Sequence, residues 1–157
     1  MKYSEHTYEI RDAVLDDCYD LAPRVRKQDV EELEASVDMS VEDQLVFAFK
    51  KSTDPKAGVI DGNVECLFGV GVDSLLTVRG TPWLISSDVL VKHAKPFLRG
   101  SRDYIRSLED EYMELSNHVY VKNKDAIRWL RWLGFEIKDP EPFGYKKLMF
   151  HPFKLKV

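Results

Sequence analysis

The chain of 157 residues has a formal net charge of −4, with 44% hydrophobic and 32% charged residues, which fits one folded domain and excludes a disordered protein. The acidic balance argues against a nucleic-acid partner, because neutralising phosphates needs a basic surface. No apolar run reaches the roughly 20 residues of a membrane span, and the start lacks the regions of a signal peptide, so we expect a cytosolic or packaged protein with no membrane partner.

The first half of the chain alternates between strand and helix signals. Pro23 interrupts a helical spacing of apolar residues, and Ser40 is the expected N-cap of a further helix. The pair Asp61-Gly62 accepts positive φ and predicts the turn of a β-hairpin, with a bulge expected at Gly69 or Gly71. In chain order we therefore expect a strand at 8–11, helices at 15–22, 24–36 and 40–49, and strands at 57–60 and 64–72.

The second half predicts a strand and a helix, followed by a strand–helix–strand unit. Pro82 to Ser86 is an apolar run short enough for a central strand. From Pro96 the apolar residues recur at helical spacing, and Gly134 closes the last helix. We therefore expect strands at 82–86 and 115–121 that run parallel and separate at one end, helices from 96 and at 125–133, and strands at 135–137 and 144–153.

Chain-wide patterns indicate a single domain over 1–157. The sequence has no internal repeat, no linker and no low-complexity tract. Its two cysteines, Cys18 and Cys66, give neither a disulfide framework nor metal-ligand spacing. We therefore expect two small buried thiols, a reducing compartment and no metal site.

The segment after the expected strand at 115–121 resembles the last conserved block of the GCN5-related N-acetyltransferase (GNAT) family. The positions of Asn123, Ala126 and Gly134-Phe135 follow the spacing of that block. The resemblance implies an α/β (α+β) domain with the GNAT fold, in which a central mixed, mainly antiparallel sheet of six to seven strands is flanked by helices. The alternative is a buried amphipathic helix, with Trp129 and Trp132 as core aromatics and Asn123 as a cap only.

A narrower resemblance concerns phage proteins. The stretches PWLISSD and SNHVYVKNKDAIRWLRWLGF, with a tail that contains Pro140-Glu-Pro-Phe-Gly144 and His151-Pro-Phe, are similar to phage-encoded GNAT-like proteins. Relatives in that branch include internal virion or internal core proteins of short-tailed phages. This resemblance implies the host cell cytoplasm or the virion as the location, and other virion proteins as partners.

The family's cofactor signature is incomplete. GNAT proteins hold the pyrophosphate of coenzyme A (CoA) with a Gln/Arg-x-x-Gly-x-Gly/Ala loop between the fourth strand and the next helix. Val89, Lys92 and Ala94 occupy its three defining positions, and only Ala94 conforms. The resemblance implies acetyl-CoA as the cofactor, held by Ser87, Lys92, His93, Ala94, Lys95 and Asn123. The alternative for the basic residues, from Lys92 to Arg106, is a solvated helix face.

The resemblance also places the candidate chemistry. Leu130 stands where many GNAT enzymes have a tyrosine that protonates the leaving thiolate. Asp88 and Glu32 are the candidate catalytic carboxylates, and Asp88 is alternatively a turn or cap residue. Asn117 and His118 point to opposite faces of a strand, so we expect at most one of them in the cleft. The candidate substrate-binding residues are Arg26, Asp29 and Asn117.

Three functions follow from these patterns. The first is a CoA-dependent N-acyltransferase that transfers an acetyl group from acetyl-CoA to an unknown amine. The second is a non-catalytic GNAT-fold protein that serves as an internal virion or interaction component. The third is a binding module for another nucleotide-like ligand, which only the basic cluster supports. A surface salt-bridge ladder is the structural alternative for Arg26, Asp29 and Glu32.

Overall fold

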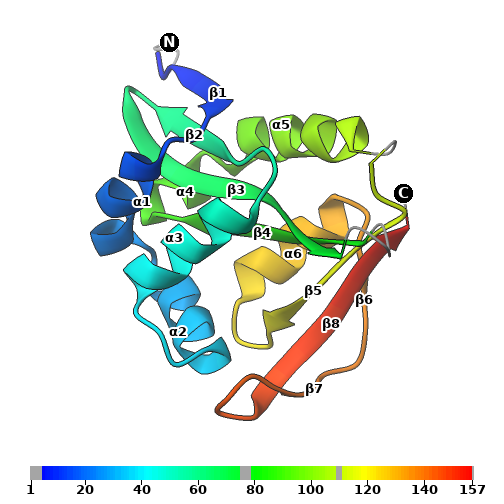
Figure 1. The fold of residues 1–157 in the computed structure, drawn as a ribbon. Coiled ribbons are helices and arrows are strands. Elements are labelled where there is room, and N and C mark those ends of the chain that lie inside the picture. The colour runs from blue at the N-terminus through cyan, green and yellow to red at the C-terminus, as the bar shows by residue number, and fades with distance from the viewer. Residues whose placement is uncertain (1–4, 75–78, 109–110, 157) are drawn as a thin grey trace.

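One mixed sheet organises the fold, an α/β architecture that the computed structural model describes at residues 5–74, 79–108 and 111–156 (Figure 1). Over these residues the sheet has eight strands in the order β1-β2-β3-β4-β5-β8-β6, with β7 paired to β8. The strands are β1 (Tyr8–Asp12), β2 (Lys56–Ile60), β3 (Asn63–Ser74), β4 (Arg79–Ser86), β5 (Glu114–Tyr120), β6 (Glu136–Ile137), β7 (Glu141–Phe143) and β8 (Leu148–Lys156). The sequence predicts six to seven strands, and the additional one is β7, a three-residue strand.

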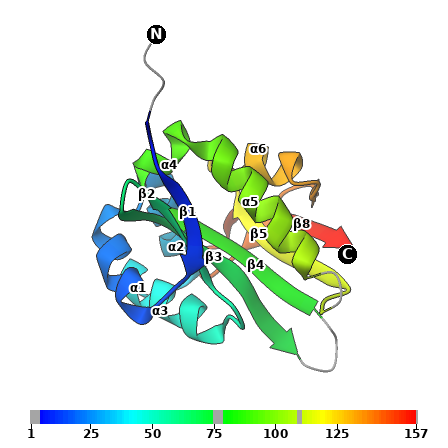
Figure 2. The ribbon, with the colours of Figure 1, turned by 90° about the horizontal axis from the view of Figure 1, so that it is seen from above.

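Helices cover both faces of this sheet. Figures 1 and 2 show α1–α3 on one face and α4–α6 on the other. Neighbouring residues of β3 therefore meet different helices: Leu67 packs with residues of α1 and α3, whereas Phe68 packs with residues of α5 and α6. The helices are α1 (Leu15–Leu21), a 3₁₀ turn at Ala22–Arg24, α2 (Lys27–Ser36), α3 (Val41–Lys51), α4 (Asp88–Lys92), α5 (Ala94–Ser107) and α6 (Lys124–Trp132). None of the described helices is long and apolar enough to cross a membrane.

The turn and the helix cap that the sequence predicts are present in the structure, whereas the predicted bulge is not where it was expected. Asp61 and Gly62 have φ values of 50° and 84° and join β2 to β3, and the Ser40 side chain accepts a hydrogen bond from the Asp43 amide. The prediction of a bulge at Gly69 or Gly71 is wrong. The pairing of β3 with β4 is regular there, and its register shifts between Val72 and Ser74 instead.

The strands β4 and β5 pair over two residues and then separate. They run parallel, with Arg79 opposite Glu114 and Gly80 opposite Leu115, which confirms the expected parallel pair that diverges at one end. Beyond this point β5 pairs along its length with β8 on its other side. The Asn117 side chain reaches across the gap and donates a hydrogen bond to the Pro82 carbonyl at 2.9 Å. The separation therefore leaves a gap in the middle of the sheet.

The turn between β7 and β8 packs against the end of α2, and a substitution in the turn tests this contact. Gly144 has a φ of 79°, and a Cβ there would lie 2.6 Å from the Ala35 carbonyl oxygen at the end of α2. We expect Gly144→Ala to lower the free energy of unfolding by about 2–3 kcal/mol, because it adds a steric clash to the backbone strain. Gly62→Ala is the matched control, since its φ is 84° and nothing lies within 4 Å of its Cβ. Urea unfolding measures both; equal losses would contradict a packed turn.

Candidate functional site

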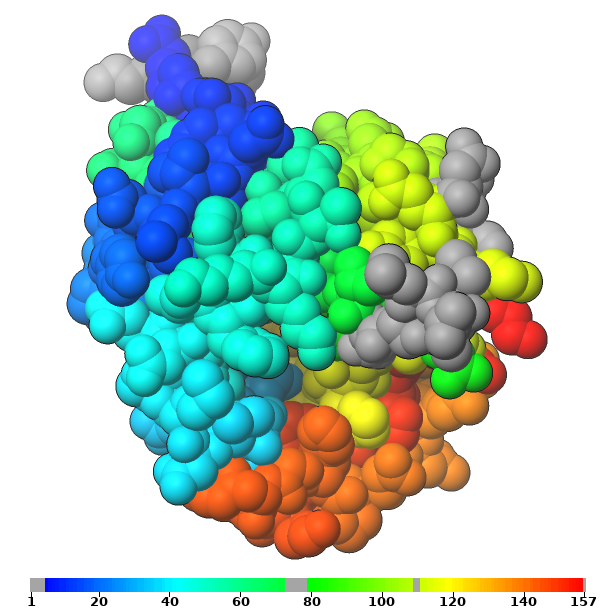
Figure 3. Space-filling view, viewed as in Figure 1, coloured from blue at the N-terminus to red at the C-terminus, as the bar shows by residue number. Residues whose placement is uncertain are grey.

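The gap between β4 and β5 opens into a cavity of about 340 Å³. Residues of α2, β3, β4, β5, α5, α6 and the β7 segment line it, so it extends to both faces of the sheet. Most of the lining side chains are apolar or aromatic. Figure 3 shows the face with α2 and α3 hollowed below α3, between α2 and the β7–β8 segment. The cavity is the candidate site because it joins both faces at the point where the strands separate.

Four residues singled out in the sequence meet beside this cavity in one buried network. Arg26 donates a hydrogen bond from Nη2 to Oδ1 of Asn123, although 97 positions separate them. The Asn123 amide nitrogen donates to Asp29 Oδ1 at 3.1 Å and to Glu32 Oε2 at 3.4 Å. Arg26 and Asn123 are 1% and 0% exposed. The salt-bridge ladder on a solvated helix, the alternative for these residues, is therefore excluded.

The network ties the separated ends of the two strands together. On the β4 side, Ser86 donates its amide to Asp29 Oδ2 at 3.0 Å and accepts from the Arg26 amide at 2.9 Å. On the β5 side, Tyr120 donates its amide to Glu32 Oε1 at 2.6 Å. These bonds satisfy backbone groups that a paired strand would otherwise satisfy. The start of α2 thus takes the place of strand pairing at the open end of the gap.

The charges of the network favour a proton on Glu32. Arg26 is the buried cation and contacts the carboxylates of both Asp29 and Asp125, each at 3.2 Å. Burial raises the pKa of Glu32 to about 8, against the opposing hydrogen bond from the Tyr120 amide, and the nearby Asp29 raises it further. Burial raises the pKa of Asp29 as well, but Arg26 opposes this at short range, so of the two carboxyls Glu32 is the one that holds a proton. At neutral pH Glu32 therefore holds a proton that it releases just above neutrality.

Asn117 and His118 both line the cavity, which corrects the expectation that at most one of them would. Their side chains do point to opposite faces, but the cavity reaches both faces through the gap. The Asn117 amide is engaged by the Pro82 carbonyl and by the His118 amide. The His118 ring stacks on Phe143 at 3.8 Å between ring centroids, and burial lowers its pKa.

A short helix occupies the position of the expected cofactor loop. Ser87 caps α4 by accepting from the Val89 amide at 3.2 Å, and the side chain of Leu90 is buried. The predicted helix thus begins eight residues earlier than Pro96, as two segments that meet at His93. None of the residues proposed for this loop is among those that line the cavity, and neither is Asp88. The loop residues are Ser87, Lys92, His93, Ala94 and Lys95.

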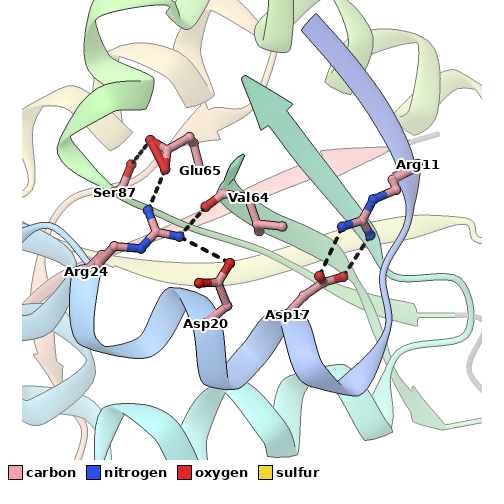
Figure 4. Close-up of polar contacts among 7 residues, drawn as sticks. All are labelled: Arg11, Asp17, Asp20, Arg24, Val64, Glu65 and Ser87. Carbon is pink, nitrogen blue, oxygen red and sulfur yellow. Dashed lines mark hydrogen bonds and ion pairs between the residues drawn. The ribbon is translucent and has the colours of Figure 1, made fainter. Parts of the chain in front are cut away.

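Neighbouring contacts hold Ser87 and His93 in structural positions. Figure 4 shows Glu65, which is 4% exposed, receiving hydrogen bonds from both Ser87 and Arg24. His93 Nδ1 lies 2.7 Å from the Tyr8 hydroxyl, and its ring lies against His6 at the β1 edge of the sheet. Both side chains thus fix α4 and the start of α5 to other strands.

Positive charge gathers on the helical layer of α5 and α6. The residues 92–106 and 122–131 hold nine lysines and arginines and two acids, a formal net charge of +7, whereas the rest of the chain holds fourteen and 25, a net −11. Arg102 ties the two helices together, because its guanidinium lies 3.8 Å from the centroid of the Trp132 ring. The sequence indicates the basic residues of α5 but not that those of α6 belong to the same layer, since only the fold brings the two helices side by side (Figure 2).

Two further groups in the cavity wall were missed. Ser101 on α5 is 5% exposed, and its hydroxyl has no hydrogen-bond partner among the described residues. A lone hydroxyl on the apolar face of a helix was the available signal. Leu84 on β4 contributes backbone groups, which no residue pattern could indicate.

Solved structures that share this fold include acetyltransferases. No protein-family model and no curated protein matches the sequence. An acetyltransferase of the GNAT family from Streptococcus pneumoniae is 13% identical over 96% of this chain and 99% of its own, with a TM-score of 0.69. YncA from Salmonella typhimurium, solved with acetyl-CoA, is 16% identical over 95% and 93%, with a TM-score of 0.61. The aminoglycoside acetyltransferase AAC(6′)-Ib, solved with coenzyme A, is 15% identical over 96% and 95%, with a TM-score of 0.67. The chain therefore has the GNAT fold.

The stability of the protein should report the proton on Glu32. Its pKa of about 8 in the folded protein lies above the ordinary value of 4.5, so the folded state binds more protons between these pH values than the unfolded state does. The free energy of unfolding should therefore decrease as the pH rises through this window. Glu32→Gln removes the titrating group and should flatten that decrease. Urea unfolding across the window measures it, and identical pH dependence in both proteins would contradict the raised pKa.

Proposed function

We propose that the protein is a CoA-dependent N-acyltransferase that moves an acetyl group from acetyl-CoA to an amine. The observation that carries the proposal is the gap between β4 and β5, which meets a basic helical layer on one face and the carboxyl of Glu32 on the other. A donor with phosphates and an acceptor with an ionisable nitrogen can thus reach the same point from opposite faces. The fold shared with CoA-bound acetyltransferases agrees with this arrangement.

The edge of β4 offers backbone partners to an extended donor. Alternate residues of a strand direct their backbone groups to the same side, and the groups of Pro82 and Ser86 meet partners on the β5 side of β4. Leu84 lies between these two residues, so its N–H and C=O point into the gap. An arm with amide groups, such as the pantetheine of CoA, pairs with these groups as an added strand would. The unpartnered hydroxyl of Ser101 adds a polar anchor on the α5 side.

Side-chain charge replaces the glycine loop at the phosphate end. We place the pyrophosphate at Lys92, Ala94 and Lys95, where α5 begins and where the two exposed lysines supply charge-assisted hydrogen bonds. Pro96 removes one amide donor from the first turn of α5, so fewer backbone donors are available than a glycine loop offers. Ser87, His93 and Asn123 hold the surrounding elements in place. Phosphate binding therefore depends mainly on charge.

Glu32 is the proposed general base. Acetyl-CoA supplies the acetyl group as a thioester, whose thiolate leaves without an acid because it is a fair leaving group. The ionised form of Glu32 takes the proton that the amine loses; with a pKa of about 8 this form is the minority at pH 7 and becomes the majority above pH 8. Leu130 lines the cavity where a tyrosine acid would stand and contributes no proton. Asp88 lies outside the cavity lining, so we assign it no part in the proton transfer.

The alternative is a non-catalytic protein of the same fold, such as an internal virion or interaction protein of a phage. Asn123 favours it, because the side chain is 0% exposed and both ends of its amide are already bonded within the protein. An amide in this state has no free group for a ligand. The short helix α4 in place of a glycine loop favours it as well.

Calorimetric titration with acetyl-CoA separates the two functions. We expect binding that weakens at high ionic strength, and a loss of at least about tenfold in affinity in the double variant Lys92→Ala, Lys95→Ala, since each charge-assisted bond contributes roughly 1.5–3 kcal/mol. The double variant Lys146→Ala, Lys147→Ala, in the β7–β8 turn, is the control and should bind as the unchanged protein does. Absence of binding in all proteins would support the non-catalytic alternative.

Turnover should separate the two candidate carboxylates. Glu32→Gln should lower turnover about 10²–10⁴-fold while leaving the affinity for acetyl-CoA unchanged, because it removes the base and keeps the hydrogen bond from the Tyr120 amide. Asp88→Asn is the matched control and should retain activity. Release of free thiol from acetyl-CoA measures both. Full activity of Glu32→Gln would remove this residue from the mechanism.

A further inference from the structure

The face of the sheet with α1–α3 has its own part of the cavity, and aromatic side chains form its wall. Trp83 packs on the cluster of buried residues from α1 and α3, and its Nε1–H donates to the Ser52 hydroxyl at 2.7 Å, which fixes the ring. Phe143 packs on Tyr120 and Phe150, with rings 5.3 Å apart for the second pair, and carries the stacked His118 ring. These contacts hold both rings in position as the wall of this part of the cavity.

The part of the cavity on the α1–α3 face, which we call the chamber, is aliphatic on its α2 side. Leu33 and Val37, which lie about one helical turn apart, line it, and Val37 is 44% exposed at the rim. The carboxyl of Glu32 lies at the inner end, beside the separated strands. A molecule in this chamber thus meets one ionisable carboxyl at its inner end and apolar surface along its length.

The charges of the cavity wall are restricted to one sign. No lysine or arginine is among the described residues that line it, and its acids are Asp29 and Glu32. Arg26 lies behind the wall, 1% exposed and bonded to Asn123 and Asp125. Burial lowers the pKa of His118, so this ring adds no cation at neutral pH. A carboxylate or phosphate in the chamber would lose its water without gaining a partner.

We infer that the acceptor is a primary amine on an apolar or aromatic body that carries no carboxylate or phosphate. The amine lies toward Glu32, and the body lies between the aromatic wall of Trp83 and Phe143 and the aliphatic side of α2. This inference rests on the proposed transferase function and names the substrate class of the same site. Amino acids and phosphorylated amines are rejected because their anionic groups find no partner in the chamber.

A matched set of amines tests the inference. 2-Phenylethylamine has the apolar body and the amine, phenylalanine adds a carboxylate to the same body, and ethanolamine keeps the amine without the body. With acetyl-CoA and the unchanged protein, we expect kcat/KM for 2-phenylethylamine to exceed that for each of the others by at least about a hundredfold. Free thiol and the mass of the N-acetyl product are the readouts. A thermal shift with each amine alone gives a second readout that needs no catalysis.

Two variants make the test specific to the chamber. Phe143→Ala should lower kcat/KM for 2-phenylethylamine about tenfold and leave acetyl-CoA affinity unchanged, whereas Tyr145→Ala, an exposed aromatic in the adjacent turn, should change neither. Val37→Arg places a cation at the exposed rim and should raise kcat/KM for phenylalanine, because its carboxylate then has a partner. This gain of activity cannot result from unfolding.

The outcomes separate the inference from the function beneath it. Acetylation of phenylalanine or ethanolamine as fast as 2-phenylethylamine would overturn the inference and leave the transferase function standing. Binding of acetyl-CoA with neither binding nor acetylation of 2-phenylethylamine would also overturn the inference. If acetyl-CoA itself does not bind, the transferase function fails, and the thermal shift with the amines alone then decides whether the chamber still takes an apolar amine.

Discussion

The hydrogen-bonded contact between Arg26 and Asn123 is the constraint on which the rest of the site depends. Parallel strands that separate expose backbone groups to a gap, and buried backbone groups without a hydrogen-bond partner cost free energy. The Arg26 network supplies hydrogen bonds to the strand ends from side chains of α2, and it brings one buried cation to the carboxylates of Asp29 and Asp125. Removing one partner from a buried network of this kind is costly, since the remaining charges lose their compensation. The gap therefore stays open because the network stabilises its ends.

The same network sets the chemistry of Glu32. A helix held against both strand ends places this carboxyl where two acids share the environment of one buried guanidinium, and burial then raises its pKa to about 8. Residues that the sequence divided among cofactor binding, acceptor binding and catalysis thus form one structural unit. Stability and acid–base behaviour are coupled in this unit, because each carboxyl that tunes the proton also bonds a strand end.

Short sequence patterns predicted the secondary-structure elements and their order well. Contacts between residues far apart in the sequence could not be predicted. The turn at Asp61-Gly62, the cap at Ser40 and the parallel strands were read correctly because each depends on local backbone preference or on element order. The resemblance to the GNAT block singled out Asn123, but the sequence could not show that its amide oxygen accepts a hydrogen bond from Arg26, since 97 positions separate the two residues. The helix α4 was missed because its five residues carry too short a periodic pattern. The cavity depends on strand separation, which no residue pattern locates to the ångström.

The two faces of the sheet on either side of the gap carry opposite charge. A layer with a net charge of +7 covers one face, while the chamber on the other face is lined by acids and apolar groups without a lysine or arginine among its described residues. Fields of this kind steer anions and cations to different faces of a protein. An anionic donor and a cationic acceptor would then approach from opposite faces, and Glu32 lies where the two routes meet. In that arrangement the missing glycine loop weakens the hold on the donor but leaves its direction of approach intact, because long-range charge sets the approach and short-range backbone geometry sets only the final fit.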